Sequence, residues 1–349
     1  MTDSTRESLT LKLPAGFDLL AGDQQLSAEV YDALEAVEEE LLAALSSTDE
    51  LANSAARYLA EAGGKRVRPL LTILTSLLGS GIVPSVRQAA VVMEMTHLAT
   101  LYHDDVMDSA PLRRGAPSAH EVWGNSVAIL TGDLILARAS QLMTHLGEAG
   151  TRIQSQTFER LVMGQLHETV GPEDGEDPYE HYERVIADKT GSLVAAAARL
   201  GAYFGNTSPE VASMVQEYGE AVGIAFQLAD DVIDLTAEGA TSGKTPGTDL
   251  REQVATLPVL LLRRAAADPA SPTYEAARAA LALVDGDLSS DEALTEAVRA
   301  IVEHPVTEES WEIARGWAAQ AKAAIAPLPE STVKSALLSF ADSVVDRDA

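Results

Sequence analysis

The chain has 349 residues, of which 46% are hydrophobic, and a formal charge of −28 from 25 Lys and Arg against 53 Asp and Glu. It has no cysteine, which excludes disulfides, thiolate metal sites and a cysteine nucleophile, and its negative charge disfavours nucleic acid as a partner. The first residues, MTDSTRESLTLKLP, do not resemble a secretory signal, and no stretch approaches the roughly 18 uninterrupted apolar residues of a membrane span, so we expect a cytoplasmic protein without a membrane span.

Residues 1–25 are polar and lack a helical period, which predicts a loose N-terminal tail. From about residue 27 onward, apolar residues recur at helical spacing, and alternating β-branched runs are absent from the sequence. No linker-like segment separates two cores, so the pattern predicts one all-α domain over residues 26–349. The clearest predicted helices cover residues 28–45, 51–62, 69–79, 86–108, 126–146 and 210–236.

Local residue types predict where several of these helices begin and end. Pro69 lies in the first turn of the third predicted helix, and Ser85 is predicted to cap the fourth. Gly191 interrupts a helical pattern. The polar segments 171–178 and 237–249 are rich in Gly, Pro and charged or hydroxyl side chains, which predicts loops.

The strongest chemical signal is a DDxxD pattern that occurs twice, at 104–108 and 230–234. On a helix, positions i, i+1 and i+4 lie on one side, so each copy should direct its carboxylates into one small volume. Carboxylate oxygens suit hard cations such as Mg²⁺. A single copy in so acidic a chain could equally be a solvated face, but two copies at the ends of apolar helices favour metal binding. The candidate ligands are Asp104, Asp105, Asp108, Asp230, Asp231 and Asp234.

The second signal is basic. The run GGKRVRP, residues 63–69, places Lys65 and Arg68 beside a predicted helix N-terminus, where free N–H groups and the helix dipole favour a diphosphate. A glycine-capped helix end with a basic last turn is the alternative. Arg113 and Arg114 follow the first aspartate motif, and arginine binds phosphate oxygens in a bidentate manner. An exposed pair of loop charges is the alternative here.

Together these motifs resemble the trans-isoprenyl diphosphate synthase (polyprenyl synthetase) family over roughly residues 30–265. GGKRVRP, HDDVMD followed by RRG, DKTGSL, FQLADDVID and GKTPGTDL occur in that family's order and spacing. The resemblance implies a single-domain, isoprenoid-synthase-type helical bundle around a central cavity, and a homodimer. It also implies head-to-tail condensation of isopentenyl diphosphate with an allylic prenyl diphosphate.

The resemblance further implies roles for the matching residues. The two aspartate triads would face each other and hold three Mg²⁺ ions on the allylic diphosphate, and the loop at 239–248 would act as a lid. The allylic site would be completed by Arg113, Lys189, Thr190, Gln227 and Lys244. Isopentenyl diphosphate would be bound by Lys65, Arg68, His97 and Arg114, although a lone His97 would otherwise be read as a core histidine. The residues expected to carry catalysis are Asp104, Asp105, Asp108, Arg113, Lys189, Asp230, Asp231 and Lys244.

Product length is predicted from the helix that carries the first aspartates. Thr100 and Ala99 lie four and five residues before Asp104, about one turn of roughly 5.4 Å along the axis. Family members with short products usually have an aromatic residue at one of these places. The small residues here predict an open tunnel and a hexaprenyl to nonaprenyl product, as used for quinone side chains.

Several alternatives stay open at this point. The family often has a lysine in the segment that reads QVATLP here, residues 253–258, and only Arg251 lies near enough to replace it. A short-chain synthase making geranylgeranyl or farnesyl diphosphate would share every motif. A terpene cyclase would usually lack the second DDxxD and the GGKRVRP run, and a non-catalytic partner subunit would be expected to lose aspartates from one triad.

Overall fold

The structure of the chain is a computed structural model that describes residues 14, 16, 17, 20, 22–236 and 246–346. The all-α prediction is confirmed, because the described residues form helices and a single two-stranded hairpin. The chain divides into two compact units. Unit 1 comprises Met1–Ser155, Ala196–Val215 and Leu328–Ser339, and unit 2 comprises Gln156–Ala195, Gln216–Pro327 and Phe340–Ala349. The extent of one domain over residues 26–349 stays a prediction.

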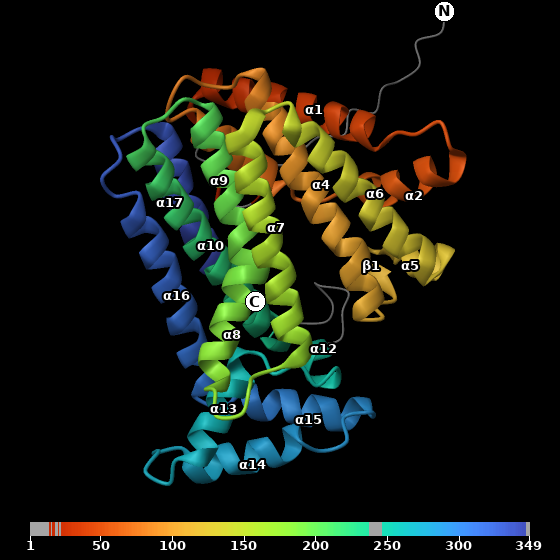
Figure 1. The fold of residues 1–349 in the computed structure, drawn as a ribbon. Coiled ribbons are helices and arrows are strands. Elements are labelled where there is room, and N and C mark those ends of the chain that lie inside the picture. The colour runs from red at the N-terminus through yellow and green to blue at the C-terminus, as the bar shows by residue number, and fades with distance from the viewer. Residues whose placement is uncertain (1–13, 15, 18–19, 21, 237–245, 347–349) are drawn as a thin grey trace, which may run out of the picture. The chain divides into compact units, whose positions relative to one another are not determined.

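Unit 1 contains the N-terminal helices and the hairpin (Figure 1). The hairpin pairs β1 (Leu112–Arg113) with β2 (Ala116–Pro117) in antiparallel register. The helices of this unit are α1 (Gln24–Leu45), α2 (Glu50–Glu61), α3 (Val67–Ser76), α4 (Pro84–Met107), α5 (Ala119–Trp123) and α6 (Asn125–Thr144). Four helices have residues in both units: α7 (Gly147–Val170), α9 (Ser192–Phe204), α10 (Pro209–Thr236) and α17 (Thr332–Val345).

Side-chain caps explain where the first helices begin. The Asp23 carboxylate accepts a hydrogen bond from the Leu26 N–H at 3.1 Å, so α1 begins at Gln24, four residues before the predicted start. The prediction that Ser85 caps the fourth helix is wrong. Pro84 already occupies the first turn of α4 behind an extended Val83, because proline needs no N–H partner there.

The core of unit 1 is built around α4, which packs against α1, α3 and α6. In Figure 1, α4 and α6 run side by side. Helix α3 meets α9 at very short range, because a Cβ at Gly201 would lie 2.0 Å from the Thr72 carbonyl oxygen. The Thr75 hydroxyl also donates to the Ala198 carbonyl at 2.8 Å, which satisfies a buried polar group inside this contact.

Unit 2 holds the rest of the chain. Its further elements are α8 (Pro178–Ile186), η2 (Ala187–Gly191), α12 (Thr248–Arg251), α13 (Leu257–Ala267), α14 (Tyr274–Val284), α15 (Asp291–Val302) and α16 (Val306–Ala324). The predicted interruption at Gly191 is a π-helical turn, η2, rather than a break. A Cβ at Gly164 on α7 would lie 2.7 Å from the Lys189 nitrogen, so the absence of a side chain lets α7 approach this turn.

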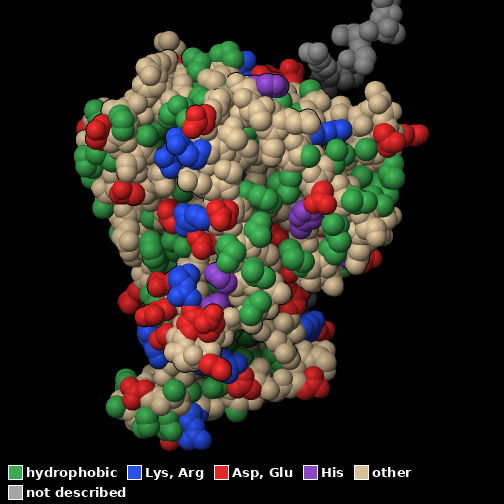
Figure 2. Space-filling model, viewed as in Figure 1, with side chains coloured by type: hydrophobic (Ala, Val, Ile, Leu, Met, Phe, Trp, Pro, Cys, Tyr) green, Lys and Arg blue, Asp and Glu red, His purple; other side chains and the backbone are tan. Residues whose placement is uncertain are grey.

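Acidic side chains are spread over the face shown in Figure 2, and most of the basic side chains visible there lie next to acidic ones. Among the described residues, α6 is the one helix long and apolar enough to cross a membrane by length and composition alone. Only 33% of its most apolar 18-residue stretch is buried, and the core helices of soluble proteins can be equally long and apolar. The expected absence of a membrane span stays a prediction.

Candidate active site

The first aspartate motif lies at the C-terminal end of α4 in unit 1. Asp105 is fully buried, Asp104 is half-buried, and Asp108 is exposed as the C-cap, where its N–H donates to the Asp104 carbonyl at 2.8 Å. The carboxylates therefore differ in environment, although the sequence pattern treats them alike. Asp104 and Asp108, one helical turn apart, are accessible to a ligand, whereas Asp105 is held inside the protein.

Asp105 is paired with Arg113, whose Nη2 and Nε lie 2.6 and 2.7 Å from its Oδ1. Burial raises the pKa of the Asp105 carboxyl, and the Arg113 hydrogen bond and charge oppose that rise. Arg113 lies on β1, so the β1–β2 hairpin positions it beside Asp105. Its two turn residues, Arg114 and Gly115, have φ of 54° and 78°, as the tight turns of two-residue hairpins require.

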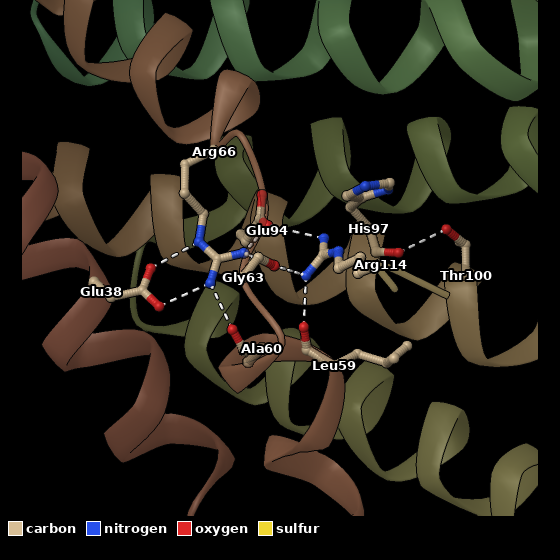
Figure 3. Close-up of polar contacts among 9 residues, drawn as sticks. All are labelled: Glu38, Leu59, Ala60, Gly63, Arg66, Glu94, His97, Thr100 and Arg114. Atoms are coloured by element: carbon tan, nitrogen blue, oxygen red, sulfur yellow. Dashed lines mark hydrogen bonds and ion pairs between the residues drawn. The ribbon is translucent and has the colours of Figure 1, made fainter. Parts of the chain in front are cut away.

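A cluster of cationic side chains lies in the turn before α3, on the first turn of α3 and on the hairpin, and Figure 3 shows part of it. Arg68 is half-buried, and its Nε is buried without a hydrogen-bond partner in the described part of the chain. Burial lowers the pKa of Arg68, while the charge of Glu94 opposes this fall and the charge of Arg114 adds to it. Lys65 is exposed at the same turn. The sequence prediction had grouped these cations, and unit 1 brings them together.

His97 lies on α4, seven residues before Asp104. Burial, and then the charges of Arg68 and Arg114, hold the pKa of His97 well below its usual value. Its imidazole is therefore neutral near pH 7 and can donate one N–H to an anion without carrying charge. The Thr100 hydroxyl donates to the His97 carbonyl at 2.9 Å, and Ala99 is fully buried beside it.

Arg114 is only partly available to a ligand. Its Nη1 donates to the Leu59 carbonyl at 2.6 Å and to the Gly63 carbonyl, so it satisfies acceptors at and just beyond the C-terminal end of α2. Its Nη2 lies 3.9 Å from a carboxylate oxygen of the buried Glu94.

The second aspartate motif lies at the C-terminal end of α10 in unit 2. Asp231 is buried, and protein groups use both of its oxygens. Gln227 Nε2 donates to Oδ1 at 3.1 Å, while the Tyr182 hydroxyl and the Leu257 N–H, the latter at 3.3 Å, donate to Oδ2. Burial raises the pKa of Asp231 to about 6, against the opposing effect of these three donors. Asp230 and Asp234 are half-buried.

The predicted partners of the second motif lie on neighbouring elements of unit 2. The π-helical turn presents Lys189, whose ammonium group pairs with Glu168, and Thr190, whose hydroxyl donates to Gln227 Oε1 at 3.2 Å. Asp234 Oδ2 accepts from the Asp249 N–H at 3.2 Å. Lys244, like most of the predicted lid loop, lies outside the described residues.

The structure thus assembles the predicted residues as two half-sites, one in each unit. That the two aspartate triads face each other stays a prediction from the family resemblance. Sequence reasoning missed several residues that hold these half-sites in place: Glu38, Glu94, Glu168 and Tyr182. Arg66 also belongs to this set, and although it lies inside the GGKRVRP run, the sequence assigned it no role.

The donor sets suit a hard divalent cation, although the described residues contain no group of three or more His, Cys, Asp or Glu side chains arranged as a complete metal site. Buried Asp105 Oδ2 has no hydrogen-bond partner in that part of the chain. The carboxylates that are not fully buried are Asp104 and Asp108 on the first motif and Asp230 and Asp234 on the second. This fits Mg²⁺, which usually keeps several waters and takes further oxygens from substrate phosphates.

Comparison with known proteins gives one family. The family model "Polyprenyl synthetase" matches residues 49–295. A nonaprenyl diphosphate synthase of Mycobacterium tuberculosis is 42% identical over 334 residues, covering 95% of this chain and 97% of that protein. A geranylgeranyl pyrophosphate synthase of Corynebacterium glutamicum, solved with calcium and isoprenyl diphosphate, superposes with a TM-score of 0.82 at 42% identity, covering 93% of this chain and 98% of that one.

A polyprenyl synthase of Caulobacter crescentus, also solved with calcium and isoprenyl diphosphate, superposes with a TM-score of 0.83. It is 30% identical, and the match covers 97% of this chain and all of that chain, 100%. These likenesses confirm the predicted isoprenoid-synthase-type helical fold.

Proposed function

The chain belongs to the polyprenyl synthetase family and is a prenyl diphosphate synthase, and we propose that it uses Mg²⁺ to join isopentenyl diphosphate head-to-tail to allylic diphosphates. The prediction of a trans-prenyltransferase is confirmed by the relatives it matches. The observation that best supports the assignment of substrates to residues is the cationic cluster of unit 1. Among the residues that the structure describes, Arg68 Nε is buried without a hydrogen-bond partner, and the charge of Arg68 helps to lower the pKa of His97, in a chain of net charge −28.

Isopentenyl diphosphate would bind at that cluster. Lys65 and Arg68 would neutralise its diphosphate, and His97 would donate an N–H to a phosphate oxygen. The remaining free donors of Arg114 would complete the contacts. Since His97 and the first aspartates share α4, one rigid helix would set the distance between the two substrates.

The allylic diphosphate would bind at the aspartate motifs. Mg²⁺, when bound by the accessible aspartates, would neutralise charge on the leaving diphosphate. Arg113, anchored on Asp105, and Lys189 would donate to the same leaving group, Lys189 exchanging Glu168 for phosphate oxygens. Breaking the allylic C–O bond releases diphosphate, the double bond of isopentenyl diphosphate forms the new C–C bond, and the departing diphosphate would accept the proton then lost.

We propose a long product, in the hexaprenyl to nonaprenyl range. Ala99 is small and buried, and Thr100 follows it on α4, so neither would block a chain growing beside this helix. A nonaprenyl diphosphate synthase and a geranylgeranyl pyrophosphate synthase are each 42% identical to the chain, so a shorter product is the alternative.

The Ala99→Phe variant should shorten the main product by at least one isoprene unit, because the ring would occupy the path of the growing chain. Mass spectrometry of the products measures this directly. Thr100→Ala, which removes bulk at the neighbouring position, serves as the control and should not shorten the product. An unchanged distribution in Ala99→Phe would remove Ala99 from the determinants of length.

We also propose a cytoplasmic homodimer, with α6 as the contact face. Leu130 is 65% exposed and Ile129 is 42% exposed, so this face leaves much apolar surface in water for a single copy. A second copy of the chain would cover it. Light scattering after size exclusion should give twice the mass of the chain for the wild type. The Leu130→Glu variant should have the mass of a single chain.

The activity itself is tested by product analysis. The purified protein is incubated with isopentenyl diphosphate, Mg²⁺ and, separately, dimethylallyl, geranyl, farnesyl or geranylgeranyl diphosphate. A prenyl diphosphate series that EDTA abolishes supports the proposal and identifies the primer. Conversion of an allylic diphosphate to a hydrocarbon without consumption of isopentenyl diphosphate would support a terpene cyclase instead.

A further inference from the structure

We propose that Glu38, Arg66 and Glu94 form a buried frame whose function is to position the isopentenyl diphosphate ligands Lys65 and Arg68. In this account Arg66 is a positioning residue and does not touch the substrate. The inference rests on the proposed function of the cationic cluster and adds residues to which that function assigned no role.

Arg66 uses all of its hydrogen-bond donors inside unit 1 (Figure 3). Its Nε and Nη2 form a bidentate pair with the Glu38 carboxylate, each at 2.7 Å, and Nη1 donates to Glu94 at 2.9 Å. The two remaining N–H groups reach the carbonyls of Ala60, at 2.9 Å, and Gly63, at 3.2 Å. A guanidinium has five N–H donors, and here each has an acceptor, so none is left for a phosphate.

The backbone at Arg66 explains why this frame is needed. Arg66 precedes α3 with φ 49° and ψ 34°, a left-handed conformation that is unfavourable for a non-glycine residue. The side-chain contacts offset that cost and fix the turn on which Lys65 and Arg68 stand. The frame also requires glycine at position 64, because a Cβ there would lie 2.8 Å from Arg66 Nη1 and 2.9 Å from Arg114 Nη2.

The frame also joins elements that come from distant parts of the sequence. Glu38 lies on α1, Glu94 lies on α4 one turn before His97, and Arg114 of the hairpin shares the Gly63 carbonyl with Arg66. The side chains of Arg66, Glu94 and Glu38 are 5%, 2% and 21% exposed, so the bond to Glu94 is shielded from water and the bonds to Glu38 are largely shielded. Any change at Arg66 should therefore move the ligands on both sides of it.

The cationic cluster keeps positive charge for the substrate after the ion pairs of the frame are counted. Lys65, Arg66, Arg68 and Arg114 outnumber the carboxylates of Glu38 and Glu94 by two, and His97 is neutral. The cluster therefore keeps a net positive charge that matches a diphosphate, while the frame fixes its geometry.

The test compares Arg66→Lys and Glu38→Gln with a control, Arg57→Lys, which alters an exposed i,i+4 pair with Glu61 on α2. Lysine keeps the charge but cannot make the bidentate fork. Calorimetry with isopentenyl diphosphate alone gives a dissociation constant without turnover. Steady-state kinetics give KM for each substrate, and thermal unfolding reports stability.

Arg66→Lys should raise the dissociation constant and KM for isopentenyl diphosphate about tenfold, and Glu38→Gln about threefold. KM for the allylic substrate should stay within about twofold, since its ligands lie elsewhere, and the control should match the wild type. Lower thermal stability with unchanged affinity for isopentenyl diphosphate would overturn the proposal and leave the frame a purely structural device. An equal rise in both KM values would overturn it as well.

If Arg66→Lys does not fold, Glu38→Gln decides, because it removes one partner and leaves Glu94 in place. Wild-type protein is measured first. Failure of the wild type to bind isopentenyl diphosphate would contradict the proposed function itself, whereas normal wild-type binding with unchanged variants would contradict only the frame.

Discussion

The two aspartate motifs share the letters DDV and a final Asp, yet the protein holds their buried middle residues in different ways. Asp105 pairs with a cation, Arg113, supplied by a hairpin eight residues later. Asp231 is held by the neutral donors of Tyr182, Gln227 and the Leu257 backbone, with no cation among its contacts in the described part of the chain. In both motifs the middle aspartate anchors a helix end while the outer aspartates stay accessible.

The difference shows that a motif specifies residue types and not their charge environment. Opposite charge compensates in part for the burial of Asp105, whose pKa is still raised, whereas only neutral donors oppose the burial of Asp231, whose pKa rises to about 6. The two anchors should therefore respond differently to substitution and to pH.

The largest expected effect comes from removing the cation at the first motif. Arg113→Gln leaves the Asp105 carboxylate buried without its partner, which should lower the free energy of unfolding by about 3 kcal/mol. Urea denaturation of the metal-free protein measures this. Arg57→Gln, at an exposed ion pair, should cost less than about 1 kcal/mol. Equal losses in both variants would show that Asp105 does not depend on Arg113.

At the second motif, removing a donor to the buried aspartate should lower the free energy of unfolding by less. Tyr182→Phe removes one of three donors to Asp231, and the loss of one hydrogen bond to a carboxylate should cost about 2 kcal/mol. Tyr179→Phe on the same helix, whose hydroxyl donates to Glu183 at 3.1 Å, is the matched control and should cost less. A Tyr182→Phe variant as stable as the wild type would remove Tyr182 from the anchor.

The smallest effect concerns pH. The folded-state pKa of Asp231 lies above its unfolded value of 3.8, so the folded protein binds this proton more tightly. Its contribution to stability is full below pH 3.8 and is lost as pH rises through about 6. In EDTA, lowering the pH from 7 to 5 should stabilise the wild type relative to Asp231→Asn by about 1 kcal/mol. A pH-independent difference would contradict the raised pKa.

Much of the fold could be predicted from local patterns. Helix α10 begins within one residue of its predicted start and ends at the predicted residue, since its apolar period is long and uninterrupted. The β1–β2 hairpin was missed, because two-residue strands show no alternation that a sequence pattern could reveal. Helix α1 was predicted four residues short, because its start depends on the side chain of Asp23.

The candidate site was predicted only as far as its motifs extend. The aspartates and the GGKRVRP run could be named from residue type and spacing, whereas His97 was named only through the family resemblance. The sequence could not show which of these cations is buried, because Arg66 is held by Glu38, 28 residues away, and by a left-handed backbone conformation. Tyr182 likewise lies 49 residues from Asp231, and no local pattern links them.

We propose that the outer aspartates bind the metal while the middle ones anchor the helix ends, and Mg²⁺ titration of activity in four variants tests this directly. These are Asp104→Asn, Asp105→Asn, Asp230→Asn and Asp231→Asn. We expect that the outer variants need at least about a hundredfold more Mg²⁺ than the wild type, or lose activity. The Mg²⁺ requirement of the middle variants should rise by less than about tenfold, and their thermal stability should fall. Middle variants that raise the Mg²⁺ requirement as much as the outer ones would contradict the proposal.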